Sequence, residues 1–106
     1  MLDCIFCKII NGDVETSFLH EDEICVAFND INPKAKTHVL IVCRKHIPSI
    51  ADMAEGDEKI IGHMINCAKE IARKLNLDGY KLQFNVGKAG GQEVFHVHLH
   101  LLSNSG

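Results

Sequence analysis

In two parts of the chain, apolar residues recur at the three- and four-residue steps of an α-helix. The longer run predicts a helix over residues 57–77, which Asp78-Gly79 ends. The shorter run predicts a helix over residues 3–10, with Asp3 as its cap and Asn11-Gly12 as its end. The apolar stripe of the longer helix comprises Ile60, Ile61, Met64, Ile65, Ala68, Ile71, Ala72 and Leu75.

Other segments carry the patterns of β-strands: residues 17–21, 23–28, 38–43, 80–86 and 94–102. The tight junction between the first two predicts a hairpin. The order is therefore a short helix, three strands, a long helix and two strands, with neighbouring strands joined by short loops. This order predicts an α+β fold, with a five-stranded antiparallel sheet and the long helix over one of its faces.

Length and composition place the chain among small globular domains. Its 106 residues, 46% hydrophobic and 24% charged, correspond to a single domain over residues 1–106. A net charge of −3 argues against a duplex nucleic-acid binder. No apolar run is long enough for a membrane span, and no secretory signal is apparent. An odd number of cysteines, five, then predicts free thiols and a cytoplasmic location.

Strict alternation over residues 95–102 places three histidines on one face of the last predicted strand: His96, His98 and His100. At neutral pH most imidazoles are uncharged, so they can act as bases or nucleophiles. Three interpretations compete: a solvated polar face, a His-x-His metal site, and nucleophilic chemistry on an anion.

The loop that leads into these histidines favours the last interpretation. Residues 85–92 read NVGKAGGQ, and their glycines let backbone N–H groups approach an anion closely. The spacing fits neither a Walker loop nor a dinucleotide-binding fingerprint. Followed directly by the histidine strand, the loop predicts a phosphate site.

These motifs together resemble the nucleotide-binding branch of the histidine triad superfamily, in its bacterial form. Residues 96–102 (HVHLHLL) match the triad itself, and the likeness continues in order at 4–10 (CIFCKII), 27–33 (AFNDINP), 37–42 (THVLIV) and 90–92 (GGQ). The resemblance implies a homodimeric hydrolase or transferase that cleaves purine nucleoside phosphoramidates or related adenylates at the α-phosphate. Alternatives are a dinucleoside polyphosphate hydrolase and a zinc-stabilised nucleotide-binding module with little turnover.

The resemblance also assigns roles to residues. His98 would be the nucleophile that forms a nucleotidyl-histidine intermediate, His100 would contact the phosphate, and His96 would orient His98, partly through its carbonyl. His38 matches a further pocket histidine, although it could simply be a polar residue that opens a strand. The expected nucleotide contacts are Asp30, Ile31, His38, Asn85, Gly91, Gln92, Glu93, His98 and His100.

Two of these positions leave alternatives open. Asp30 matches the ribose-binding carboxylate, and it is also a natural turn residue before Asn32-Pro33. Glu93 stands where many members of the family carry Ser, and a carboxylate close to a phosphate would be repulsive. Strand alternation predicts that the Glu93 side chain points away from the histidine face, which leaves its backbone N–H available.

The Cys4-x-x-Cys7 pair has the spacing of half a metal site, although a redox pair or two packed thiols would look alike. The resemblance implies a structural zinc held by Cys4, Cys7, His46 and His96. It does not involve the other two histidines, His20 and His63, which we expect at the surface.

Overall fold

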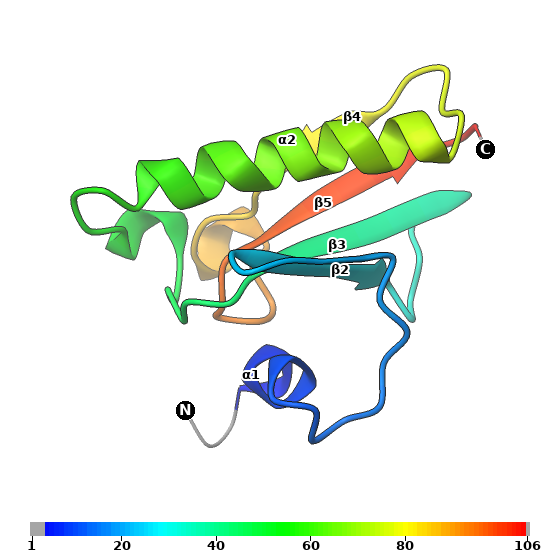
Figure 1. The fold of residues 1–106 in the computed structure, drawn as a ribbon. Helices are drawn as coiled ribbons and strands as arrows, with labels where there is room; N and C mark the ends of the chain where they lie inside the picture. The colour runs from blue at the N-terminus through cyan, green and yellow to red at the C-terminus, as the bar shows by residue number, and fades with distance from the viewer. Residues whose placement is uncertain (1–3, 106) are drawn as a thin grey trace.

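The computed structural model describes residues 4–105 and contains a five-stranded antiparallel sheet in the order β1-β2-β3-β5-β4 (Figure 1). The predicted α+β fold is confirmed. The strands are β1 (His20–Glu21), β2 (Cys25–Asn29), β3 (Thr37–Cys43), β4 (Lys81–Gln83) and β5 (His98–Ser103). The helices are α1 (Ile5–Ile10) and α2 (Glu58–Lys74), with 3₁₀ turns at Ile50–Asp52 and Lys88–Gly90.

The long helix α2 covers one face of the sheet, as predicted (Figure 1). Its buried side chains pack on every second residue of β2, β3 and β5, because strand side chains alternate between faces. This core contains Cys25, Ala27, Val39, Ile41, Cys43, Met64, Cys67, Ala68, Ile71, Ala72, Leu99 and Leu101. No helix among residues 4–105 is both long and apolar enough to cross a membrane.

The opposite face of the sheet carries α1 (Figure 1). Phe6 packs there with Val26, Phe28, Leu40 and Val42. In the β3–β5 pairing, His98 lies opposite Val42 and His100 opposite Leu40. Because paired residues of neighbouring strands face the same way, the two histidines lie on the α1 side of the sheet.

Three predicted strands are clearly shorter than their patterns suggest. The first of them, β1, covers only residues 20–21 of the predicted 17–21. Residues 94–97 precede β5 instead of belonging to it, because Val97 N–H donates to the Ile47 carbonyl (2.8 Å) and not to a neighbouring strand. Likewise β4 covers only residues 81–83 of the predicted 80–86. An alternating pattern can therefore continue past the last ladder hydrogen bond, where loop packing decides the backbone path.

The ends of both helices also differ from expectation. The predicted Asp3 cap lies outside the described residues, and the cap of α1 is Cys4, whose Sγ accepts from Cys7 N–H at 3.3 Å. Helix α2 ends before Leu77 because Asn76 adopts φ of 56°. Leu77 N–H then donates to the Ala72 carbonyl (3.0 Å), which closes a Schellman motif and packs Leu77 on the core.

Candidate active site and metal centre

A cavity of about 830 Å³ opens on the α1 side of the sheet. Its walls come from α1, the end of β2, the loop before β5 and the histidine face of β5. A volume of this size accommodates a nucleotide-sized ligand. Of the predicted nucleotide contacts, the structure places these in the lining: Asp30, Ile31, Asn85, Gly91, Glu93, His98 and His100.

His98 is held in one tautomer by the backbone. Its Nδ1–H donates to the His96 carbonyl oxygen at 2.7 Å, which leaves Nε2 with a free lone pair. Phe6 packs against the ring in a T-shaped arrangement, with 5.0 Å between the ring centroids. Burial lowers the pKa of His98 and outweighs the opposing effect of the carbonyl hydrogen bond. The arrangement is that of a neutral imidazole whose unprotonated nitrogen can attack an electrophile.

A relay of hydrogen bonds sets the tautomer of His100. Lys34 N–H donates to His38 Nδ1 at 3.1 Å, so the neutral His38 ring carries its hydrogen on Nε2. That Nε2–H donates to His100 Nδ1 at 2.9 Å, which leaves the hydrogen of His100 on Nε2. Burial, followed by the neighbouring His98 and His38, lowers the pKa of His100 to about 4, so the ring is neutral at pH 7.

His100 Nε2 is buried and has no hydrogen-bond partner within residues 4–105. A buried N–H without an acceptor is costly, and an acceptor atom on a bound ligand would remove that cost. His98 and His100 lie side by side, with 4.9 Å between ring centroids. The strand therefore presents a nucleophilic nitrogen beside a hydrogen-bond donor, as attack on a phosphate requires.

His38 is buried and is not in the cavity lining. The structure therefore places it behind His100, where its Nε2–H can orient the His100 ring. Asp30 lies at the end of β2, where its Oδ1 accepts from Asn32 N–H (2.9 Å) and its Oδ2 lies 3.5 Å from His38 Nε2. Asp30 thus forms the predicted turn and still lines the cavity. Ile31 beside it is 91% exposed.

The loop before β5 is held by Gln92, which is buried and does not line the cavity. Its Oε1 accepts from Gly87 N–H at 2.9 Å, and its Nε2 donates to the Pro48 carbonyl at 2.7 Å. Gly91 has φ of 87°, a backbone conformation that favours glycine. Glu93 lines the cavity, which agrees with a role for its backbone N–H, and the direction of its side chain stays a prediction. Strand alternation does not apply there, because Glu93 precedes β5.

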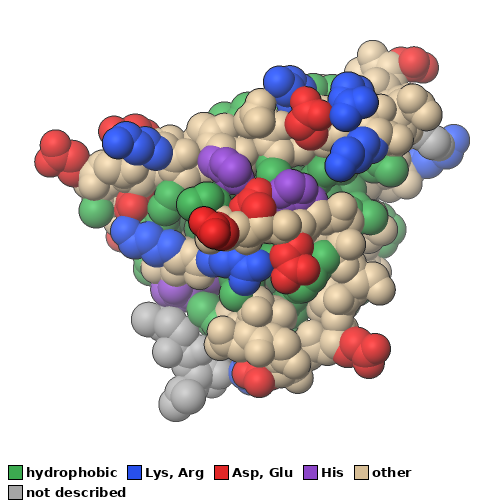
Figure 2. Space-filling view, in the orientation of Figure 1, with side chains coloured by type: hydrophobic (Ala, Val, Ile, Leu, Met, Phe, Trp, Pro, Cys, Tyr) green, Lys and Arg blue, Asp and Glu red, His purple; other side chains and the backbone are tan. Residues whose placement is uncertain are grey.

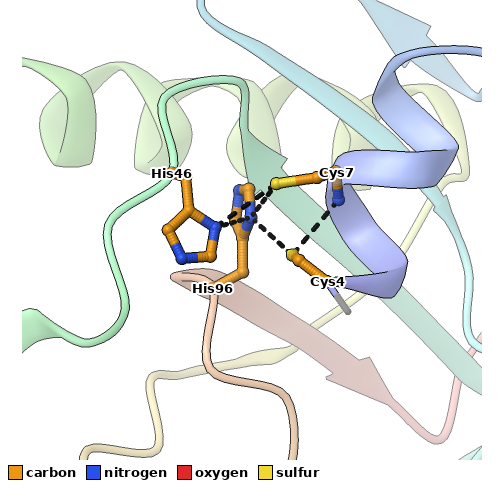
Figure 3. Close-up of side chains that lie close together, drawn as sticks. All are labelled: Cys4, Cys7, His46 and His96. Atoms are coloured by element: carbon orange, nitrogen blue, oxygen red, sulfur yellow. Dashed lines mark hydrogen bonds between the residues drawn. The ribbon is translucent and has the colours of Figure 1, made fainter. Parts of the chain in front are cut away.

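The predicted metal ligands come together in one group of four (Figure 3). Cys4 Sγ lies 3.2 Å from His96 Nδ1, Cys7 Sγ lies 3.3 Å from His46 Nδ1, and the two Nδ1 atoms are 3.1 Å apart. In a tetrahedral zinc site with Cys and His ligands, neighbouring donor atoms are about 3.3 to 3.7 Å apart. The cysteines come from the start of α1, and the histidines flank β3 and β5.

The tautomer of His96 suits a metal ligand. Its Nε2–H donates to the Cys43 carbonyl at 2.6 Å, so the lone pair of Nδ1 faces the two sulfurs. A backbone acceptor behind the imidazole is the usual outer partner of a metal-bound histidine. Burial, with Cys4 beside it, raises the pKa of the Cys7 thiol to about 11, and a bound cation would reverse this effect. The four residues therefore fit zinc.

Residue His96 connects the two sites. Its ring belongs to the Cys–His group, whereas its carbonyl orients His98, and it does not line the cavity. The alternation of histidines in the sequence does not show that the ring and the carbonyl of His96 serve different sites. Phe6 and Ile9 of α1 also line the cavity, and no local signal in the sequence separates them from ordinary core residues.

The two remaining histidines, which we expect at the surface, are partly exposed in the structure. The side chains of His20 and His63 are 28% and 39% exposed, and both contact Asp22 on the α2 side of the sheet. Nothing in their spacing indicates this contact, because His63 belongs to α2 and His20 to β1.

The fold and the paired histidines define a class of hydrolase built on a histidine strand, and comparisons with known proteins agree. A family model described as "Scavenger mRNA decapping enzyme C-term binding" matches residues 3–106. Purine nucleoside phosphoramidase of Escherichia coli K12 is 40% identical over 102 residues, which cover 94% of this chain and 86% of that protein.

Solved structures show the same relationship. The HIT family hydrolase of Legionella pneumophila superposes with a TM-score of 0.92 at 42% identity, covering 98% of this chain and 95% of the other. A Zn-bound histidine triad family protein of Mycobacterium smegmatis gives a TM-score of 0.85 at 32% identity, with 96% and 75% covered. The chain belongs to the histidine triad (HIT) family, and it is a hydrolase of that family.

Proposed function

We propose that the protein hydrolyses purine nucleoside phosphoramidates or related adenylates at the α-phosphate, with His98 as the nucleophile. The observation that carries this proposal is the buried Nε2–H of His100, which has no acceptor within residues 4–105 and lies beside the neutral His98 ring. The phosphoramidase activity of the E. coli relative supports the substrate class.

In the first half-reaction, the lone pair of His98 Nε2 forms a bond to phosphorus. The bond from phosphorus to the leaving nitrogen breaks, and that nitrogen takes a proton from solvent, which the water of the second half-reaction later returns. His98 becomes positively charged, and its Nδ1–H bond to the His96 carbonyl stabilises that charge. Water then attacks phosphorus and restores neutral His98. One water is consumed, since its hydroxyl joins the nucleoside monophosphate and its proton balances the released amine.

The other cavity residues bind the substrate in this proposal, and His38 supports them from behind the cavity wall. The Nε2–H of His100 donates to a phosphate oxygen, and His38 is a positioning residue that keeps the hydrogen on that nitrogen. Asp30 accepts the ribose hydroxyls, and the exposed Ile31 packs on the base.

The loop completes the binding of the phosphate. Asn85, Gly91 and the backbone N–H of Glu93 contact the phosphate or the sugar, because all three residues line the cavity. Gln92 acts indirectly, by holding the loop against the Pro48 carbonyl.

The nucleophile can be identified by trapping the intermediate. The protein is mixed with an adenosine phosphoramidate and its intact mass is measured. His100→Ala, which keeps the nucleophile, should accumulate an added adenylyl mass, whereas His98→Ala on the same strand should show none and no turnover. Unchanged turnover in His98→Ala would refute the mechanism. Nucleotide binding without turnover by the wild type would favour the regulatory-module alternative instead.

We also propose that Cys4, Cys7, His46 and His96 hold one structural zinc ion. The donor distances and the tautomer of His96 support this, as does the Zn-bound M. smegmatis relative. Such a closed Cys₂His₂ site contributes folding free energy and would fasten α1 to the segment that orients His98. Cys7→Ala should lose this zinc and lower the melting temperature. Equal zinc content in Cys7→Ala and the wild type, measured after desalting, would exclude the site.

A homodimer in the cytoplasm completes the proposal and rests on the family resemblance. Light scattering coupled to size-exclusion chromatography gives the mass in solution, and a monomer at micromolar concentration would count against the dimer.

A further inference from the structure

A second cluster of potential metal ligands surrounds Asp22, in the turn between β1 and β2, away from the cavity. His20 Nε2 and His63 Nε2 lie 2.6 and 2.8 Å from Asp22 Oδ2. The sulfurs of Cys67 and Cys25 lie 3.7 and 3.9 Å from the same oxygen and 3.5 Å from each other. Figure 2 shows histidine side chains with acidic side chains between them below the long helix.

The backbone orients the Asp22 carboxylate toward this cluster. Its Oδ1 accepts from Ile24 N–H at 2.7 Å and from Cys25 N–H at 2.9 Å, which leaves Oδ2 for the histidines and thiols. Arg44 Nε–H donates to the Asp22 carbonyl at 2.6 Å and fixes the turn from outside. Although burial raises the pKa of Asp22, the hydrogen bonds from His20, His63 and these N–H groups hold it well below its usual range. The carboxylate is therefore preorganised and ionised.

The donor atoms are spaced for a tetrahedral cation. A zinc site with Zn–S of about 2.3 Å and Zn–O of about 2.0 to 2.2 Å places its sulfurs about 3.7 Å apart and sulfur and oxygen about 3.5 Å apart. The corresponding distances here are 3.5 Å between Cys25 and Cys67, and 3.7 and 3.9 Å from these sulfurs to Asp22. The two thiols and the carboxylate thus already enclose a position of the right size.

The fourth donor is His20 Nε2, which belongs to the same group of mutually close ligand atoms. Its 2.6 Å contact with Asp22 Oδ2 would have to open to about 3.3 Å around a zinc ion. The His20 side chain is 28% exposed, so the ring can move outward by this amount. His63 lies outside this group of four but remains a hydrogen-bond donor to the carboxylate.

We propose that Cys25, Cys67, Asp22 and His20 form a second metal site, for zinc or another thiophilic divalent cation, with His63 positioning the carboxylate. Two thiolates select zinc or cobalt over magnesium or calcium. Without a metal, burial raises the pKa of both thiols, so each carries its proton. Binding releases those two protons and forms two metal–sulfur bonds.

The site would join distant parts of the chain. His20 belongs to β1 and Cys25 to β2, whereas Cys67 comes from the middle of α2. A bound ion would therefore fasten the β1–β2 hairpin to the long helix. Because a ligand of the folded state stabilises it, zinc should raise the melting temperature. None of these residues lines the nucleotide cavity, so the role of the ion is structural.

The test compares three proteins loaded with zinc and then desalted: wild type, Cys67→Ala, and Cys43→Ala as the matched control. Cys43 is a buried cysteine of the same core, outside both ligand groups. Zinc per chain, from elemental analysis, should fall by one in Cys67→Ala and stay unchanged in Cys43→Ala. The comparison uses a difference between variants, so it does not depend on whether the Cys4–Cys7 group holds metal.

Cobalt provides a second readout. In Cys7→Ala, which disables the first group, Co²⁺ should still produce the near-ultraviolet absorption of a cobalt–thiolate bond, and adding Cys67→Ala should abolish it. Equal zinc content in wild type and Cys67→Ala, or an equal loss in Cys43→Ala, would overturn the proposal. If Cys67→Ala fails to fold, His20→Ala removes a half-exposed ligand, and unchanged zinc content in that variant would overturn it equally.

Discussion

The relay from Lys34 through His38 to His100 makes a sharp prediction about substrate turnover. In His38→Leu, His100 Nδ1 loses its donor at 2.9 Å and Lys34 N–H loses its acceptor at 3.1 Å. Nothing then keeps the hydrogen of His100 on the nitrogen that would face the phosphate. The variant should therefore bind nucleotide but stabilise the transition state poorly.

The expected magnitude follows from the hydrogen bond that the change removes. A buried polar atom left without its partner costs about 1 to 3 kcal/mol. If this cost falls on the transition state, kcat/KM decreases by about 5- to 150-fold. In His38→Gln, the amide N–H₂ can donate to His100 Nδ1, so this variant should keep more activity than His38→Leu.

Two measurements test this reasoning. Hydrolysis of an adenosine phosphoramidate at pH 7 gives kcat/KM for the wild type and both variants. Nitrogen-15 NMR of the His100 ring reports its tautomer directly, and a merely structural role for His38 would leave that tautomer unchanged. Equal activity in His38→Leu and the wild type, or an unchanged tautomer, would refute the relay.

Three further predictions concern stability and the loop. The free energy of unfolding should fall as the pH drops from about 6.5 toward 4, because the lowered pKa of His100 lets the unfolded chain take up a proton before the folded one does. Urea titrations should show a weaker fall in His100→Gln than in the wild type, and an identical fall would contradict this. Gln92→Ala should cost about 1 to 3 kcal/mol of stability and raise KM, since Gly87 N–H and the Pro48 carbonyl lose their hydrogen-bond partner. An unaltered KM would mean that the loop does not bind substrate. Phe6→Ala should cost about 3 to 5 kcal/mol in thermal or urea unfolding, because this ring is 6% exposed between α1 and the sheet; a cost below 1 kcal/mol would show that α1 packs loosely.

Where the chain is regular, its sequence predicted both the elements and the faces of their residues. The period of two in β5 places His98 and His100 on one face, and this holds because successive strand side chains alternate whatever the neighbours are. The same rule does not extend to Glu93, which precedes the strand. Periodicity describes a residue only while its backbone remains in the regular element.

The contacts of the histidines outside β5 depend on how distant parts of the chain pack together. The resemblance, and not the pattern, suggested the grouping of Cys4 and Cys7 with His46 and His96, because the residues in contact are separated by up to 92 positions. No resemblance or pattern indicated that His20 and His63 meet at Asp22. The strands and the long helix can be predicted from the local spacing of apolar residues, because the backbone geometry of each element repeats over a few residues. Which imidazole meets a thiol, a carboxylate or another imidazole was decided only by the tertiary structure, since such contacts arise when distant segments pack together.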